Sequence, residues 1–298
     1  MKYKELIDLQ IFAGHEKQDR YSSMVLAKLR KTSIFTKLFN RKYEGTPTAG
    51  AVKIPVRDTE VAVGDYDKSK GGEMSQGTTT YKTLPIDKDK YVNELIDGYD
   101  AASVPDNLVA DRLDSAGYSM GISLDSELIN LLIENGTFSA NTTALTKDTV
   151  YDSIVDEVAA LKKKGLNITE MWLAVTNELY ATLLKSPEFI KASALGDDVV
   201  QNGRVGKIAG IDVYETNNIP DDKKVEYIIG NNVFCHYVDE WLVPAGVNDL
   251  KDGKHIGASA VQGRRVYGNM VSRTETVTIK KSIANASEEQ NASVSLDK

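Results

Sequence analysis

The most reactive side chains in this sequence are one cysteine and three histidines. Cys235 and His236 are adjacent, which suggests the thiolate–imidazole pair of a thiol enzyme. They fall in a segment predicted as a strand, where consecutive side chains point to opposite faces, so the two groups cannot meet. The sequence therefore predicts a core cysteine at position 235. Together with His15 and His255, His236 supplies too little material for a histidine-rich metal centre.

A calcium loop is the second candidate site. Asp65, Asp67 and Ser69 are spaced like the first ligands of such a loop. The pattern also requires glycine at its sixth position and glutamate at its twelfth, where this chain has Lys70 and Gln76. We expect no calcium site here.

The remaining polar motifs predict turns and solvent-exposed faces. Gly203, Gly206 and Gly210 lack the strand–turn–helix context in which backbone amides hold phosphate. The carboxylate pairs 221–222 and 288–289 have no basic or apolar setting that would separate their pKa values. No Ser/His/Asp set has a local signature. We therefore expect no catalytic, cofactor-binding or metal-ligating residue, no cofactor, and no enzyme.

Composition sets the broad class. The chain has 298 residues, of which 41% are hydrophobic and 27% charged, and a formal net charge of −7. These values are close to the average of soluble globular proteins and exclude wholesale disorder. No apolar run approaches the roughly 20 residues of a membrane span, and the first residues do not resemble a secretion signal. A single cysteine excludes an intrachain disulfide framework and fits a reducing compartment.

Charge is concentrated near the N-terminus. Residues 17–42 include eight basic residues and one acid, so this segment carries +7 and the rest of the chain −14. One interpretation is a solvated basic helix face. The other is an arm that lies on an acidic neighbour or an internal polyanion. A nucleic-acid reader is usually basic overall, whereas this chain is acidic.

Residues 45–92 alternate as half-buried strands do, at 52–57, 60–63 and 78–84, around a polar stretch at 64–77. Pro55 and Pro85 would each remove a ladder hydrogen bond, which favours edge strands or an isolated hairpin. Because a lone hairpin is marginally stable in water, this one must lean on a partner. Its polar tip suggests that the partner is not the chain's own core.

A long helix and a compact α/β region follow. Residues 103–134 repeat apolar side chains every third or fourth position, which predicts a rod of about 45 Å. We then expect a helix capped by Thr146, a buried strand at 171–175, a short helix capped by Asn177 and a hairpin at 206–215. The predicted strands 225–229, 233–238 and 266–279 come next, and the last fifteen residues are predicted to form a mobile tail.

This order of segments resembles the major capsid proteins of tailed bacteriophages, whose fold is shared with encapsulins and the floor of herpesvirus capsids. The most specific match is residues 203–220, which fit a G-x-V-G-x-I-x-G hairpin ending in Asn-x-hydrophobic-Pro. Residues 175–184 fit the family's Val-Thr/Asn-x-x-x-Tyr-x-x-Leu-Leu segment, and residues 263–268 look like its late strand. The likeness covers the whole chain in order, with residue-level matches at about 170–220.

The resemblance implies an α+β fold with an N-terminal arm, an extended β-hairpin loop, a peripheral domain with a long spine helix, and an axial α/β domain. The implied parts are an N-terminal arm at 1–44, an extended loop at 45–95, a peripheral domain with the spine helix at 96–146, an axial domain at 147–224, return strands of the peripheral domain at 225–283, and a flexible C-terminal tail at 284–298.

The function implied is that of a structural protein, a capsid subunit that self-assembles into hexamers and pentamers of an icosahedral shell. The implied partners are copies of itself, either a separate scaffolding protein or none, a portal, cement proteins, and enclosed double-stranded DNA bound without sequence specificity. No membrane partner is implied. The location would be the virion, after assembly in the bacterial host cytoplasm. Some relatives join subunits through loop lysines; Lys68, Lys70 and Lys82 lie in the corresponding segment, but we do not predict cross-linking.

Two alternatives remain open at this point. One is an encapsulin-type compartment that encloses a cargo enzyme, and the other is an α/β enzyme or binding module with a flexible N-terminal extension. The shell interpretation depends on the arm and hairpin, about a third of the chain. Ordering them costs on the order of 1–2 kcal/mol per residue in backbone entropy. Neighbouring copies would have to offset that cost, and the charge asymmetry predicts salt-sensitive assembly.

Overall fold

The structure is a computed structural model of the chain. It describes residues 30–42, 50–56, 60–61, 63–69, 71–72, 74, 77, 79–103, 108–141, 143–186, 204–251 and 253–282. Residues 1–29 of the predicted arm and the predicted tail at 284–298 lie outside these described residues. Within the described ranges, no helix combines the length and the apolar character that a membrane crossing requires.

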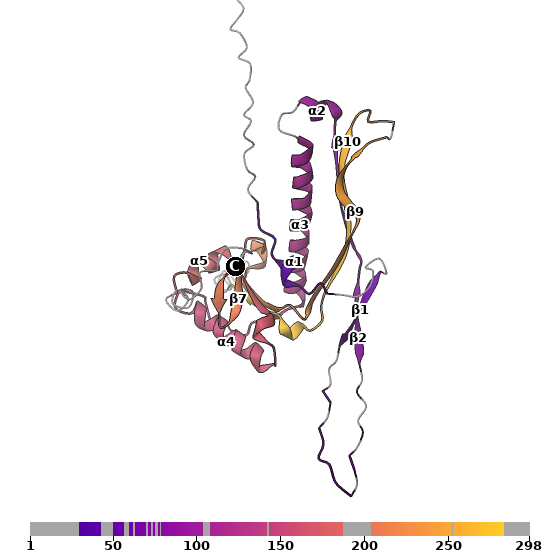
Figure 1. The fold of residues 1–298 in the computed structure, drawn as a ribbon. Coiled ribbons are helices and arrows are strands. Elements are labelled where there is room, and N and C mark those ends of the chain that lie inside the picture. The colour runs from indigo at the N-terminus through magenta and orange to yellow at the C-terminus, as the bar shows by residue number, and fades with distance from the viewer. Residues whose placement is uncertain are drawn as a thin grey trace, which may run out of the picture.

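Three parts are evident in Figure 1: an upright part made of one long helix beside a narrow sheet, a compact α/β unit at its foot, and a hairpin that points away from both. The helices are α1 (Phe35–Leu38), α2 (Gly98–Ser103), α3 (Leu108–Asn135), α4 (Val150–Lys163) and α5 (Asn177–Leu183), with short 3-10 turns η2 (Ile168–Glu170), η3 (Asp221–Lys223) and η4 (Thr274–Thr276). The strands are β1 (Ala51–Val56), β2 (Thr80–Pro85), β3 (Lys88–Ile96), β4 (Thr137–Phe138), β5 (Met171–Thr176), β6 (Arg204–Ile208), β7 (Ile211–Thr216), β8 (Val225–Asn231), β9 (Cys235–Asp249), β10 (Ser259–Val271) and β11 (Thr278–Lys281).

The compact unit is built on a six-stranded sheet in the order β4-β11-β8-β5-β7-β6. Central strand β5 is buried on both faces, as its uninterrupted apolar run from Met171 to Val175 predicts. Leu173 and Val175 face a core that includes side chains of α4 and α5. Trp172 and Ala174 face a second core, which also contains residues of α1 and the C-terminal half of α3. The sheet therefore joins the compact unit to the foot of the upright part.

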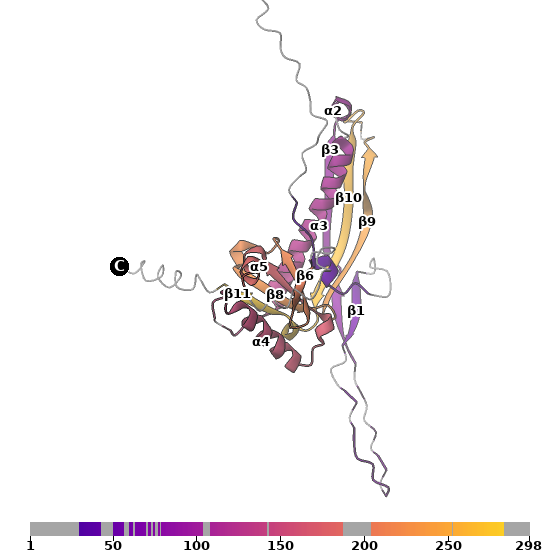
Figure 2. The ribbon, with the colours of Figure 1, turned by 60° about the vertical axis from the view of Figure 1, so that its left-hand side comes forward.

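The upright part consists of α3 and a three-stranded antiparallel sheet in the order β3-β10-β9. The helix and this sheet lie side by side in both views (Figures 1 and 2). A small core at its distal part contains Ile96, Ala116 and Val261. The β10–β9 register shifts near Gln262 and Arg264, which marks an irregularity in the long ribbon. The long helix predicted at 103–134 is confirmed as α3, with a separate short helix α2 before it.

The hairpin is a sheet of its own, β1 paired antiparallel with β2 in a register from Ala51↔Pro85 to Val56↔Thr80. This confirms the inference drawn from Pro55 and Pro85. The further strand predicted at 60–63 is wrong, because the described residues there have no strand pairing.

Several local predictions need correction. Residues 88–95, which we placed in the extended loop, form β3 together with Ile96 and pair with β10. Residues 225–231 and 278–281, expected to return to the peripheral domain, instead form β8 and β11 of the six-stranded sheet. Helix α4 begins after Thr149 and not after Thr146, since the backbone of Thr146 is held in the preceding turn. Thr176, and not Asn177, caps α5 by accepting from the backbone amide of Leu179.

Candidate functional site: the assembly surfaces

The tip of the hairpin presents apolar side chains to solvent. Val61 is 85% exposed and Val63 98%, and Met74 is fully exposed. The described tip residues lie far from the rest of the chain in both views (Figures 1 and 2). Apolar groups held away from any core of their own subunit are typical of a surface that another molecule covers.

The base of the hairpin, in contrast, rests on its own subunit. Leu84 is completely buried, and the ammonium group of Lys82 donates a hydrogen bond to the carbonyl oxygen of Ser272 at the end of β10. The expectation that the whole hairpin lacks a support within the subunit is therefore wrong for its base. It holds for the exposed tip alone.

The described part of the arm is also anchored within the subunit. Phe35 and Leu38 of α1 are buried, and the Phe35 ring meets Trp172 edge-on with centroids 5.7 Å apart. Arg30 forms an ion pair with Asp114 of α3, and Arg41 forms one with Asp239 of β9 at 2.7 Å. Because apolar burial and internal acids hold this segment, residues 30–42 rest on their own subunit and are not an arm that depends on a neighbour. Their basic side chains are exposed, as the interpretation of a solvated basic face predicts. Residues 17–29 of the basic segment lie outside the described residues.

Asn218, from the Asn-x-hydrophobic-Pro motif, connects the compact unit to the N-terminal arm. Its Nδ2 donates to the carbonyl oxygen of Thr32 at 2.8 Å and to Oδ2 of Asp125 at 2.6 Å. Asp125 in turn accepts from Ser33 Oγ at 2.9 Å. The sequence singled out Asn218 as part of a motif but missed Asp125. The burial of Asp125 could have been predicted, because it shares the apolar face of the helix with Leu128 and Ile129, whereas its hydrogen-bond partners could not.

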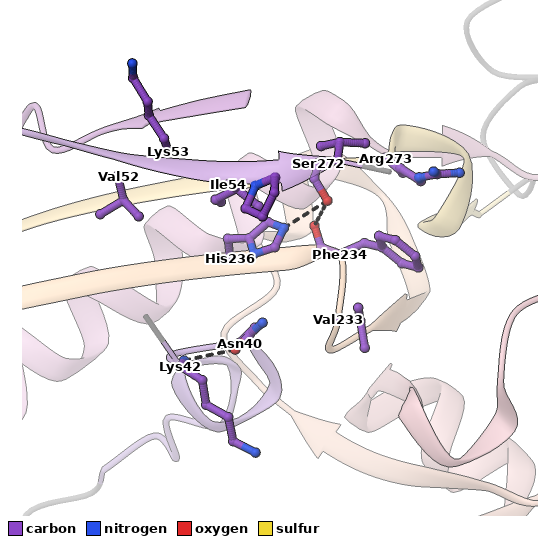
Figure 3. Close-up of a pocket in the computed structure, with 12 residues that line it drawn as sticks. Asn40, Lys42, Val52, Lys53, Ile54, Val233, Phe234, His236, Ser272 and Arg273 are labelled. Carbon is purple, nitrogen blue, oxygen red and sulfur yellow. Dashed lines mark hydrogen bonds between the residues drawn. The ribbon is translucent and has the colours of Figure 1, made fainter. Parts of the chain in front are cut away.

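A cavity of about 760 Å³ opens between the hairpin and the body (Figure 3). Its apolar walls include Ile54 of β1 and Phe234, which lies between β8 and β9. The charged side chains that line it, Lys42, Lys53 and Arg273, are all cationic. A hollow with apolar walls and only positive charge suits a segment that carries apolar and acidic side chains.

His236 lines this cavity and is buried. Its Nε2 is 2.9 Å from Ser272 Oγ, which also bonds to the carbonyl oxygen of Phe234 at 3.2 Å (Figure 3). Burial lowers the pKa of His236 to about 4, because the charged imidazolium loses its hydration. The imidazole is therefore neutral at pH 7 and serves as a packed, hydrogen-bonded side chain.

The other candidate residues are placed in turns and in the core. Cys235 is buried as predicted, and burial raises the pKa of its thiol to about 12. Asp67 accepts from both the amide and the hydroxyl of Ser69, so these residues close a turn at the hairpin tip. Gly210 has a φ of 89° in the β6–β7 turn. Among the residues that the structure describes, no three His, Cys, Asp or Glu side chains gather in a way that could hold a metal ion.

An α+β subunit with a projecting hairpin, a long helix beside a narrow ribbon and a compact α/β unit has the fold of a shell-forming protein. Residues 89–278 match the family described as phage capsid protein, and the chain belongs to that family. It is therefore a capsid subunit, with the structural role that this membership implies.

Solved structures show the same fold. A protein of Mycobacterium phage Che8 is 23% identical, with a TM-score of 0.71 over 89% of this chain and 97% of that one. A chain from the capsid of the cyanophage P-SCSP1u is 13% identical, with a TM-score of 0.69 over 89% of this chain and 92% of that one. A chain from the capsid of a native GTA particle is 11% identical, with a TM-score of 0.66 over 93% and 98% of the two chains. A comparison with curated proteins finds no match.

Proposed function

We propose that this subunit assembles with copies of itself into hexamers and pentamers, which close into an icosahedral shell around double-stranded DNA. The observation that carries the proposal is the hairpin tip, whose exposed Val61, Val63 and Met74 need a partner that the subunit does not supply. Repetition of one such heterologous contact around closed axes yields a shell instead of a fibre.

The charge of the subunit supports enclosure of DNA without tight binding. The chain carries a net charge of −7, and described arginines of the basic segment are already paired with acids of the same subunit. Phosphates repel a subunit of net negative charge, so DNA would be contained and later released without sequence-specific contacts. A separate scaffolding protein, a portal and cement proteins would be its partners during assembly in the host cytoplasm.

We further propose that the parts act separately in the shell. The extended loop would lie over a neighbour, the spine helix and ribbon would form the periphery of each hexamer or pentamer, and the compact α/β unit would meet its copies at the axes. The cavity beneath the hairpin would be covered by a neighbouring copy, since its apolar walls are open to solvent in the lone subunit.

The proposal is tested by purifying the full chain and measuring its mass by light scattering, followed by electron microscopy. We expect rings of five and six subunits or closed shells. In particles isolated from the host cell, we expect DNA that survives nuclease treatment until the shells are disrupted. A monodisperse particle of 32.7 kDa under all assembly conditions would contradict shell formation. Shells that contain a protein cargo and no DNA would contradict the proposed contents.

A further inference from the structure

One carboxylate sits at the junction of three segments that are far apart in the sequence. Asp125 is fully buried in the middle of α3. Its Oδ1 accepts hydrogen bonds from Ser33 Oγ at 2.9 Å and from the backbone amide of Phe35 at 2.8 Å. Its Oδ2 accepts from Asn218 Nδ2 at 2.6 Å. The spine helix thus holds both the arm and the end of the β6–β7 hairpin segment through a single side chain.

The chemistry of this junction calls for an acid. Burial raises the pKa of Asp125, while hydrogen bonds from Asn218, Ser33 and the backbone of Phe35 and Ile34 oppose that rise. Every group that contacts the carboxylate is therefore a donor. A carboxylate is the side chain that accepts on both oxygens, whereas an amide would place its own N–H against one of these donors. Burying an acid costs free energy. Its presence here therefore points to a task that an apolar side chain would not perform.

The contacts fix the register of the arm on the helix. Asn218 Nδ2 also donates to the carbonyl oxygen of Thr32, and the backbone amide of Lys31 donates to the hydroxyl of Tyr118, both at 2.8 Å. Residues 31–35 are thereby held by Tyr118 and Asp125 of α3 and by Asn218. A slip of one residue would move the start of the preceding segment by roughly 3.3 Å and would remove the bonds to Ser33 and Phe35.

We propose that Asp125 is a positioning residue for assembly, which sets the point on the spine helix from which the first 29 residues begin. This inference rests on the proposed function, because the arm's starting point matters to a protein that must reach its neighbours. The contacts of Asp125 with Ser33, Phe35 and Asn218, which we call the tether, lie within the single subunit. They are measurable without any shell.

The test is Asp125→Asn in the full-length chain, with Glu134→Gln as the matched control. Glu134 is an exposed carboxylate near the end of the same helix. In Asp125→Asn we expect the backbone amides of residues 31–39 to exchange with solvent about tenfold faster, because a donor now faces a donor. Amides of α4, whose buried side chains belong to the core on the other face of the six-stranded sheet, should keep their protection, and the yield of shells should fall. Glu134→Gln should change none of these.

Ser33→Ala, which removes one donor from the arm side, is the milder variant and decides the question where Asp125→Asn does not fold. Exchange at residues 31–39 that stays unchanged in the folded variants would overturn the tether. A parallel rise in amide exchange in α4 would overturn it too, since it would mean general destabilisation. Faster arm exchange with a normal yield of shells would refute the role in assembly. Failure of the unmodified chain to form shells would instead count against the proposed function.

Discussion

Gly268 lies so close to the backbone of Pro85 that a Cβ atom on Gly268 would stand 2.1 Å from the carbonyl oxygen of Pro85. The same atom would lie 2.7 Å from Cδ2 of Leu84. Gly268 belongs to β10 of the long ribbon, and Pro85 ends β2 of the hairpin. The missing side chain is therefore what allows the base of the hairpin to lie directly on the sheet.

Replacing Gly268 with alanine should lift the hairpin from its support. The new methyl group meets backbone, which cannot move aside as a flexible side chain would, and the burial of Leu84 would be lost in part. We expect a loss of about 1–3 kcal/mol in the free energy of unfolding, measured by chemical denaturation. Amide exchange at residues 80–85 should rise at the same time. An unchanged denaturation midpoint would show that the hairpin base is not held by this contact.

Gly117→Ala in α3 is the matched glycine replacement and should act in the opposite direction. An added Cβ at Gly117 meets nothing within 4 Å. Glycine in the interior of a helix costs up to about 1 kcal/mol relative to alanine, because the unfolded chain has more backbone freedom to lose. We expect the free energy of unfolding to rise by that amount. A destabilised variant would mean that α3 is bent or covered at this position.

Features set by local chemistry were predictable from the sequence. Pro55 and Pro85 identified a hairpin outside any larger sheet, because proline lacks the amide that an inner strand must donate. The apolar repeat of residues 108–135 and the turn at Gly210 are also local signals, and α3 and the β6–β7 hairpin follow them. The family resemblance then added the order of the parts, which no single motif contains.

Features that depend on distant pairing were missed. Strand β3 has the register Tyr91↔Arg264, and its mixture of charged and apolar residues does not say which segment it pairs with. The position of β8 between β5 and β11 is likewise set by partners far away in the chain. Asp125 was missed for the same reason, because its donors Ser33 and Asn218 are about 90 residues away on either side.

Stability should fall as the pH drops from about 6.5 to about 4, because of His236. Its pKa is lowered to about 4 by burial, whereas an unfolded chain keeps the ordinary value of about 6.5. Between these values the unfolded chain binds the proton more readily, so acid favours unfolding, by up to about 3 kcal/mol for one group. Denaturation midpoints measured at pH 7 and pH 4.5 should differ accordingly. His236→Gln should remove most of that difference, and an unchanged difference in this variant would assign the effect to other groups.

Cys235 should not react with thiol reagents in the folded protein. Burial raises the pKa of its thiol to about 12, so both the thiolate fraction and the access of a reagent are very small. Labelling should follow unfolding by denaturant and be counted by mass spectrometry. Val63→Cys provides the positive control, because position 63 is 98% exposed at the hairpin tip and its thiol should react at once. Rapid labelling of Cys235 in the native protein would reveal local opening of β9.

Replacing Val61, Val63 and Met74 together with serine should prevent shell formation and leave the subunit folded. These side chains are almost fully exposed, so their loss removes no packing within the subunit, and the thermal midpoint should stay within the small range usual for surface changes. Removing apolar surface that a neighbour buries weakens every copy of the contact. Electron microscopy should then find few or no shells, whereas Lys68→Ser, a polar change in the same loop, should leave their number unchanged. Normal shells from the triple variant would mean that neighbours do not bind these side chains, and that the arm and the ribbon carry the association instead.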